Sequence, residues 1–186
     1  MGRVTSSAYE WSTRHSVLTN ARRTAALVNV LSEEDTGPEA VAEVLRAYGE
    51  RGPLTLTEAE VSALREVARE LRTVFAADGT DAAAEALNQL LARTPGALRL
   101  SAHQGGTPWH PHLDSSDEAP WGEWFLASSC LALMVLVWDQ QRPPGGVCAA
   151  DRCTRVYLAQ GSGMARRYCS RRCATRSRVA AHRARS

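Results

Sequence analysis

The chain of 186 residues contains no lysine, so arginine accounts for all 22 of its basic residues. Together with the abundant alanine, this absence indicates the codon usage of a GC-rich genome, so the arginine content alone does not predict a polyanion partner. The sequence also lacks a phosphate-binding loop, a paired-carboxylate motif and a nucleophile with its base. We therefore predict that the protein is not an enzyme.

Long hydrophobic runs are absent as well. The longest apolar stretch, WFLASSCLALMVLVW from Trp124 to Trp138, has 15 residues, whereas a helix that spans a membrane needs ~20. The N-terminus shows no charged and apolar run typical of a secretory signal. We therefore expect a cytoplasmic protein without membrane contact, with a buried core helix over about 121–140.

Acidic and basic residues are unevenly distributed. Residues 148–186 hold ten arginines and one acidic residue, whereas residues 1–147 hold twelve arginines and nineteen acidic residues. The two parts carry net charges of +9 and −7, within a total of +2. A basic C-terminal part on an acidic body predicts a polyanion partner. Docking of the basic part on its own acidic body is the alternative.

Four of the five cysteines form two closely spaced pairs. Cys148 and Cys153 are separated by four residues, Cys169 and Cys173 by three, and fifteen residues lie between the pairs. This spacing predicts one structural zinc ion bound by four thiolates. Two disulfides or four free thiols are the alternatives, and disulfides need an oxidising compartment. The fifth cysteine, Cys130, lies in the apolar run and is expected to be buried.

Hydrophobic periodicity predicts a mainly α fold. Apolar residues recur at helical spacing over about 18–32, 38–48, 57–75 and 81–92, and Thr57 with Glu60 forms a capping box. The stretch 97–113 alternates around Gly105–Gly106 and predicts a β-hairpin. The fold class is therefore mainly α with a β-hairpin, followed by a small zinc module.

The stretch Pro143–Gly146 predicts a linker between two domains. The proposed boundaries are a helical domain over 1–142, a linker over 143–147 and a zinc finger over 148–186. Within the finger we expect a hairpin that pairs 155–158 with 165–168 around a turn at 160–164. A helix should then begin after Ser170, which can cap it.

A helical wheel of this last segment separates two faces. Ser177, Ala180 and Ala184 fall on the side of Cys173 and are expected to approach the metal and the hairpin. Two rows of arginines, which include Arg185, point outward. The candidate nucleic-acid-binding residues are Arg166, Arg167, Arg171, Arg172, Arg176, Arg178, His182 and Arg183. Arg176 lies nearer the metal face and can instead brace the module by donating to a knuckle carbonyl.

Three histidines cluster in the predicted hairpin. His110 and His112 alternate onto one strand face, and His103 can lie across from them. Exposed or partly packed strand histidines are the simpler interpretation, and a second metal or ligand site is the alternative.

The C-terminal residues resemble a known bacterial family. The stretch RRYCSRRCATRSRVAAHRAR (166–185) resembles the CGNR-type zinc finger, and CAADRC (148–153) with RVYL (155–158) resembles its first knuckle and following strand. The stretch ALVNVLSE (26–33) resembles the start of the ABATE domain, a helical domain with a β-hairpin that precedes the finger in that family. The signature glycine and asparagine of the finger are here Ala174 and Thr175.

This resemblance implies an ABATE-like helical domain and a treble-clef-like zinc finger. It also implies a transcription regulator of a bacterial stress response that binds duplex DNA, with Arg176 as the motif arginine. The implied zinc ligands are Cys148, Cys153, Cys169 and Cys173. The family's ABATE domain is suspected of sensing a ligand or mediating assembly, so a small-molecule effector and a homodimer are further expected partners. Of its N-terminal motif only Asn29 remains, which makes Asn29 a candidate ligand-binding residue.

Two other functions are compatible with the same basic surface. One is a structural zinc module that mediates protein–protein interaction, and the other is RNA binding. Aromatic residues make up only 6% of the chain, and the basic region shows no aromatic stacking platform for single strands. Duplex DNA is therefore the leading prediction.

Overall fold

The computed structural model describes residues 13–50, 53–159 and 166–184. The predicted turn at 160–164 and Arg185 lie outside these ranges. The helices are α1 (Thr13–Leu31), α2 (Pro38–Ala47), α3 (Glu58–Phe75), α4 (Thr80–Leu91), α5 (Trp121–Gln140) and α6 (Arg171–Arg183). The strands are β1 (Arg99–Ser101), β2 (His110–His112), β3 (Gly145–Val147) and β4 (Val156–Leu158), with a 3₁₀ turn, η2, at His103–Gly105.

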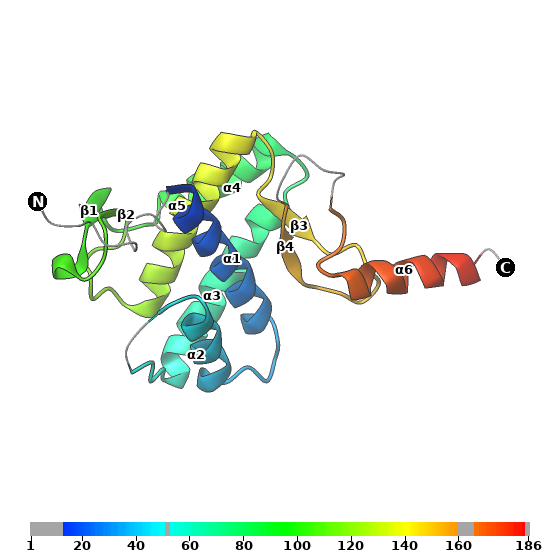
Figure 1. Ribbon diagram of the computed structural model, residues 1–186, viewed down its shortest axis with the longest axis horizontal. Helices are drawn as coiled ribbons and strands as arrows, with labels where there is room; N and C mark the ends of the chain where they lie inside the picture. The colour runs from blue at the N-terminus through cyan, green and yellow to red at the C-terminus, as the bar shows by residue number, and fades with distance from the viewer. Residues whose placement is uncertain (1–12, 51–52, 160–165, 185–186) are drawn as a thin grey trace, which may run out of the picture.

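The predicted fold class is confirmed: the protein is mainly helical and carries two small antiparallel hairpins (Figure 1). Helix α1 begins at Thr13, earlier than the apolar periodicity predicts. Helix α3 begins with the predicted capping box, because the Thr57 hydroxyl accepts from the Glu60 amide and the Glu60 carboxylate accepts from the Thr57 amide. These bonds satisfy amide donors that the first helical turn leaves unpaired.

Helix α5 forms the centre of the helical body. It packs against α1, α3 and α4, and β2 also contacts it. Among the described helices, only α5 is long and apolar enough to cross a membrane. Half of its most apolar 18-residue stretch is buried inside the protein. Its apolar residues on nearly all sides are those of a core helix surrounded by others.

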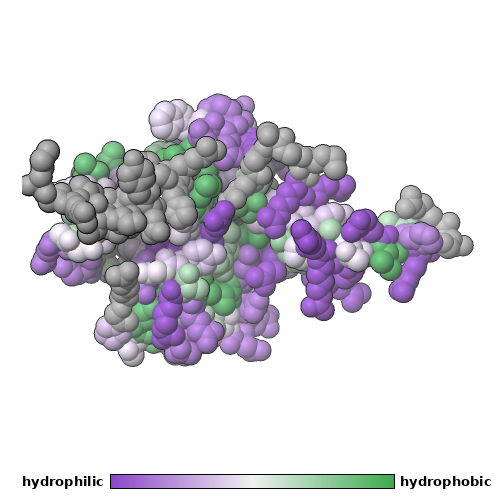
Figure 2. Space-filling model, viewed as in Figure 1, coloured by the Kyte–Doolittle hydropathy of each residue, from purple (hydrophilic) through white to green (hydrophobic). Residues whose placement is uncertain are grey.

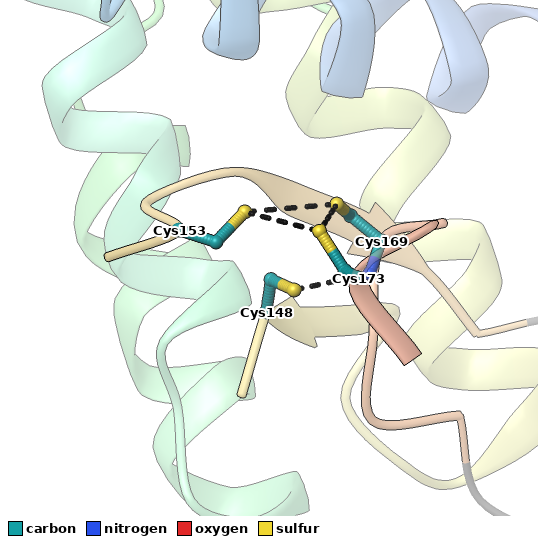
Figure 3. A group of neighbouring side chains, drawn as sticks. All are labelled: Cys148, Cys153, Cys169 and Cys173. Atoms are coloured by element: carbon teal, nitrogen blue, oxygen red, sulfur yellow. Dashed lines mark hydrogen bonds between the residues drawn. The ribbon is translucent and has the colours of Figure 1, made fainter. Parts of the chain in front are cut away.

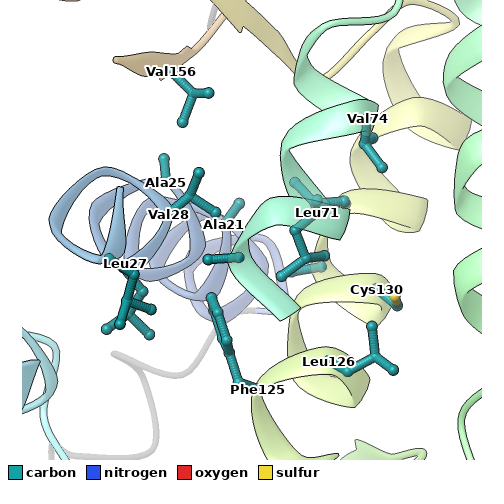
Figure 4. Close-up of a cluster of buried hydrophobic side chains, with 14 of the residues drawn as sticks. Ala21, Ala25, Leu27, Val28, Leu71, Val74, Phe125, Leu126, Cys130 and Val156 are labelled. Carbon is teal, nitrogen blue, oxygen red and sulfur yellow. The ribbon is translucent and has the colours of Figure 1, made fainter. Parts of the chain in front are cut away.

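The core is formed where these helices meet (Figure 4). Phe125 of α5, Leu71 of α3 and Leu27 of α1 are fully buried there. Cys130 is buried among them as predicted, and burial raises the pKa of its thiol to about 12. This thiol therefore stays protonated and packs as a small hydrophobic side chain.

The first hairpin joins β1 to β2 and lies at the end of the body opposite to α6 (Figure 1). Its register places Arg99 opposite His112 and Ser101 opposite His110. A Cβ atom on Gly96 would lie 2.2 Å from the carbonyl oxygen of Asp114, so only glycine allows the backbones to approach this closely. The hairpin predicted near 97–113 is therefore present, with short strands.

The second hairpin differs from the prediction. Strand β4 pairs with Gly145–Val147, and the described part of the predicted partner, residues 166–168, contains no strand. The physical reason is packing: Val156 and Leu158 are buried in the main core, where β4 contacts α1 and α3. A Cβ atom on Gly145 would lie 1.8 Å from the Tyr157 carbonyl oxygen, so the pairing needs glycine there. Residues of the expected linker thus form a strand that rests on the helical body.

Candidate metal centre and nucleic-acid interface

Four cysteine sulfur atoms converge where the second hairpin meets α6 (Figure 3). The Sγ atom of Cys153 lies 3.7 Å from that of Cys169 and 3.8 Å from that of Cys173, and Cys169 and Cys173 are 3.6 Å apart. With Cys148, all four lie within 4.8 Å of one another. A tetrahedral zinc ion with Zn–S bonds of about 2.3 Å holds its sulfur atoms about 3.8 Å apart. The donor set and its spacing therefore fit one structural zinc ion.

These separations also decide against disulfides. A disulfide needs sulfur atoms about 2.05 Å apart, and all five cysteines are free thiols. Four thiolates in this arrangement would need a cation between them, because negative charges so close together repel one another.

Short-range hydrogen bonds hold the cysteines in place. The Cys153 amide donates to the Ala150 carbonyl at 3.0 Å and closes the first knuckle, where Arg152 adopts a left-handed φ of 56°. The Cys169 amide donates to the sulfur of Cys148 at 3.3 Å. Ser170 caps α6 as predicted, since its hydroxyl accepts from the Cys173 amide at 3.2 Å. The cap places Cys173 in the first helical turn.

The thiols of the cluster differ in acidity. Burial raises the pKa of Cys148, but hydrogen bonds from the backbone of Cys169 and Ala150 and from neighbouring thiols outweigh burial and lower this pKa to about 7. Burial and the thiols of Cys173, Cys148 and Cys153 raise the pKa of Cys169 to about 12. Cys148 is therefore more acidic than Cys169, and a bound zinc ion would favour the thiolate form of all four.

Two of the predicted nucleic-acid-binding arginines contact the zinc module itself. Arg176 donates to the Asp151 carbonyl in the first knuckle at 3.1 Å and lies 3.8 Å from the sulfur of Cys173. This is the bracing contact that its position on the helical wheel allows. Arg166 donates to the carbonyls of Tyr168, Cys169 and Leu158 and lies over the Tyr157 ring.

Helix α6 extends away from the body, and Arg176 in its second turn is its last residue with a described bond to the zinc module (Figure 1). Among the described residues of α6 only Cys173 is buried, and both Ala180 and the following Ala184 are exposed. The prediction that Ala180 and Ala184 approach the metal and the hairpin is therefore wrong, whereas Ser177 is half-buried. The wheel correctly separates the faces, but beyond Cys173 none of the other described helices or strands packs extensively against α6.

The remaining basic candidates are exposed. Figure 2 shows mostly hydrophilic residues over this part of the molecule. Arg178 donates to the Thr175 hydroxyl at 3.3 Å. The other exposed candidates are Arg167, Arg171, Arg172, His182 and Arg183.

The CGNR zinc finger family matches residues 146–186, and the ABATE family, described as "Putative stress-induced transcription regulator", matches residues 17–151. The chain belongs to the ABATE family. The resemblance seen in the sequence is thus confirmed for both domains and for their order. No curated protein matches the chain. Neither family description names an enzyme, and the absence of enzymatic activity stays a prediction.

The two matches overlap at residues 146–151, which begin within β3 and run into the first knuckle. This overlap agrees with the structure, because β3 and β4 belong to the zinc finger in sequence and to the core of the ABATE domain in packing. Val156 points from β4 toward Ala25 and Val28 of α1 (Figure 4).

Asn29 of the ABATE domain connects α1 to this hairpin. Its Nδ2 donates to the Val156 carbonyl at 3.0 Å, and its Oδ1 accepts from the Val156 amide at 2.8 Å. Asn29 was a candidate ligand-binding residue, and these contacts give it a structural role. An open pocket beside it is lined by Arg22, Tyr48 and Arg155, among others. An effector in this region and a homodimer both stay predictions.

The three histidines of the ABATE hairpin come together as their alternation indicates. Donor nitrogens of His103, His110 and His112 all lie within 4.8 Å of one another. The surrounding carboxylates of Asp114 and Asp117, which contact His112 and His103, were not predicted from the sequence. Their signal was the short spacing after His112 in the stretch HLDSSD.

Proposed function

We propose that this protein binds duplex DNA through its CGNR zinc finger and regulates transcription in the cytoplasm during a bacterial stress response. The observation that carries the proposal is the exposed helix α6, fixed at one end by the cysteine cluster and lined with arginines. The family descriptions support the regulator role.

The dimensions of α6 suit the major groove. Its 13 residues extend over roughly 20 Å at about 1.5 Å per residue, and the major groove is about 12 Å wide and admits one α-helix. The exposed small residues Ala180 and Ala184 leave room for a close approach to the duplex. The first two turns of α6, as far as Arg176, contact the zinc module, so the C-terminal half of the helix and the outer face of its first turns are available for DNA.

The arginines then divide into two groups. Arg171, Arg172, Arg178 and Arg183 are exposed along α6 and meet phosphates, with one or two of them within reach of base edges. Arg167 and His182 extend this basic surface. Arg166 and Arg176 act inside the module, because their guanidinium groups already donate to backbone carbonyls.

A salt-dependent titration tests the proposal. The zinc-loaded full chain is titrated with duplex DNA, with RNA of the same sequence and with an acidic control protein. We expect the tightest binding to duplex DNA, with the logarithm of the association constant falling linearly with the logarithm of salt concentration. The double charge reversal of Arg172 and Arg183 to Glu should reduce the slope by about two units if each contacts one phosphate.

Arg69→Glu is the matched control, because Arg69 is an exposed arginine on α3 of the ABATE domain. This variant should bind DNA as the wild type does. If reversals on α6 leave DNA binding unchanged while zinc stays bound, the proposal fails. Preference for RNA or for the acidic protein would favour the corresponding alternative function.

A further inference from the structure

The histidine cluster in the β1–β2 hairpin lies at the opposite end of the molecule from the cysteine cluster (Figure 1). The Nε2 atom of His110 lies 3.0 Å from that of His112 and 3.3 Å from that of His103. These nitrogens come from three positions: His110 and His112 on one face of β2, and His103 in the 3₁₀ turn that follows β1.

The opposite ring nitrogens determine the tautomers. Nδ1 of His110 lies 2.8 Å from the Pro108 carbonyl oxygen, and Nδ1 of His112 lies 3.0 Å from a carboxylate oxygen of Asp114. Because these oxygens only accept hydrogen bonds, each Nδ1 carries a proton. Nδ1 of His103 lies 3.4 Å from a carboxylate oxygen of Asp117, within ion-pair distance. In the neutral rings of His110 and His112 the Nε2 lone pairs therefore point toward each other, and Nε2 of His103 lies beside them.

Lone pairs in such close contact repel unless a positive charge lies between them. Zn–N bonds of about 2.1 Å place imidazole nitrogens about 3.0–3.4 Å apart in octahedral or tetrahedral coordination, and the two measured Nε2 separations fall in this range. Three nitrogen ligands leave at least one coordination position for water. Imidazole is a ligand for zinc, nickel and copper rather than for magnesium or calcium.

A second layer of polar residues holds the ligands. Asp114 is 3% exposed and accepts from Arg99, which also binds Asp117. Asp117 accepts from the Ser101 hydroxyl as well. Carboxylates that bind the second nitrogen of a ligating histidine orient the ring and increase its basicity. His103 itself adopts a left-handed φ of 45°, which turns it toward the strand.

We propose that His103, His110 and His112 form a second metal site, which binds one divalent transition-metal ion of the zinc type and leaves a coordination position open. This site is separate from the four-cysteine centre in ligand chemistry and in place. The carboxylates of Asp114 and Asp117 position its ligands.

Metal titration of the full chain tests this site. Protein that already holds one zinc ion is titrated with Zn²⁺ by calorimetry, with Mg²⁺ as a negative control. We expect one further Zn²⁺ per chain and no uptake of Mg²⁺. His110→Ala and His103→Ala should abolish binding of this second zinc ion. Asp114→Asn should raise the Kd for the second ion about ten- to a hundredfold. Each variant should keep its first zinc ion and its helical circular dichroism.

Trp109→Ala is the matched control, because Trp109 lies in the same hairpin, is 73% exposed and offers no metal ligand. It should bind the second ion as the wild type does. If the wild type takes up no second ion, a shared proton explains the cluster and the proposal is overturned. Uptake of a second zinc ion by both histidine variants, equal to that of the wild type, would also overturn the proposal. His103 lies in a partly exposed turn, so His103→Ala decides the question if His110→Ala does not fold.

Discussion

Replacing Asn29 with alanine tests how firmly the zinc finger is docked on the ABATE domain. Asn29 is 8% exposed and Val156 is 2% exposed, so water does not readily replace the amide. The variant loses both hydrogen bonds and leaves the amide and the carbonyl of Val156 without partners. A buried unpaired polar group costs about 1–3 kcal/mol. Two such groups give an expected loss of about 2–6 kcal/mol in the free energy of unfolding, a large share of the ~5–15 kcal/mol typical of a domain.

Urea unfolding of the zinc-loaded protein measures this loss, and amide hydrogen exchange at Val156 localises it. Asn88→Ala is the control, since Asn88 is exposed on α4 and the same substitution there should change stability by less than about 0.5 kcal/mol. A loss below about 0.5 kcal/mol in Asn29→Ala, with unchanged exchange at Val156, would refute the reasoning.

Three further predictions concern the metal and the second hairpin. Cys169→Ser should lose the zinc ion by elemental analysis, and chelation should unfold α6 while most helical circular dichroism of residues 1–142 remains, because small modules fold on their metal. Arg176→Ala should weaken zinc affinity about ten- to a hundredfold in a chelator competition, because it removes the bond to Asp151, whereas DNA binding of the zinc-loaded variant stays unchanged. Gly145→Ala should destabilise the protein by about 2 kcal/mol or more in urea unfolding, while Gly37→Ala, where a Cβ atom meets nothing within 4 Å, should cost less than about 1 kcal/mol.

The parts of the fold that depend on short sequence distances could be predicted. The capping box of Thr57 and Glu60, the Ser170 cap and the alternation of His110 with His112 each involve residues within a few positions of one another. The paired cysteine spacing is local in the same sense, which is why the zinc chemistry could be inferred before the fold was known.

The partner of β4 could not be predicted in this way. Gly145 and Gly146 are typical of a linker, and the choice between them and residues 165–168 depends on where Val156 and Leu158 are buried. That burial is decided by α1 and α3, which lie far away in the sequence. The polar layer around the histidines was missed for a related reason, because Arg99 reaches Asp114 and Asp117 only once the hairpin has formed.

The helical wheel of α6 shows what such a projection can and cannot establish. It correctly places Cys173 inward and Arg176 near the metal, but it cannot tell whether anything lies opposite Ala180. Among the described residues of α6 only Cys173 is buried. The direction of the helix is therefore set by the cysteine cluster and by the Arg176–Asp151 contact. The cluster is joined in turn to the ABATE domain through β4 and Asn29. If α6 binds DNA as proposed, its affinity must therefore depend on zinc and on the docking of β4, although neither contacts the duplex.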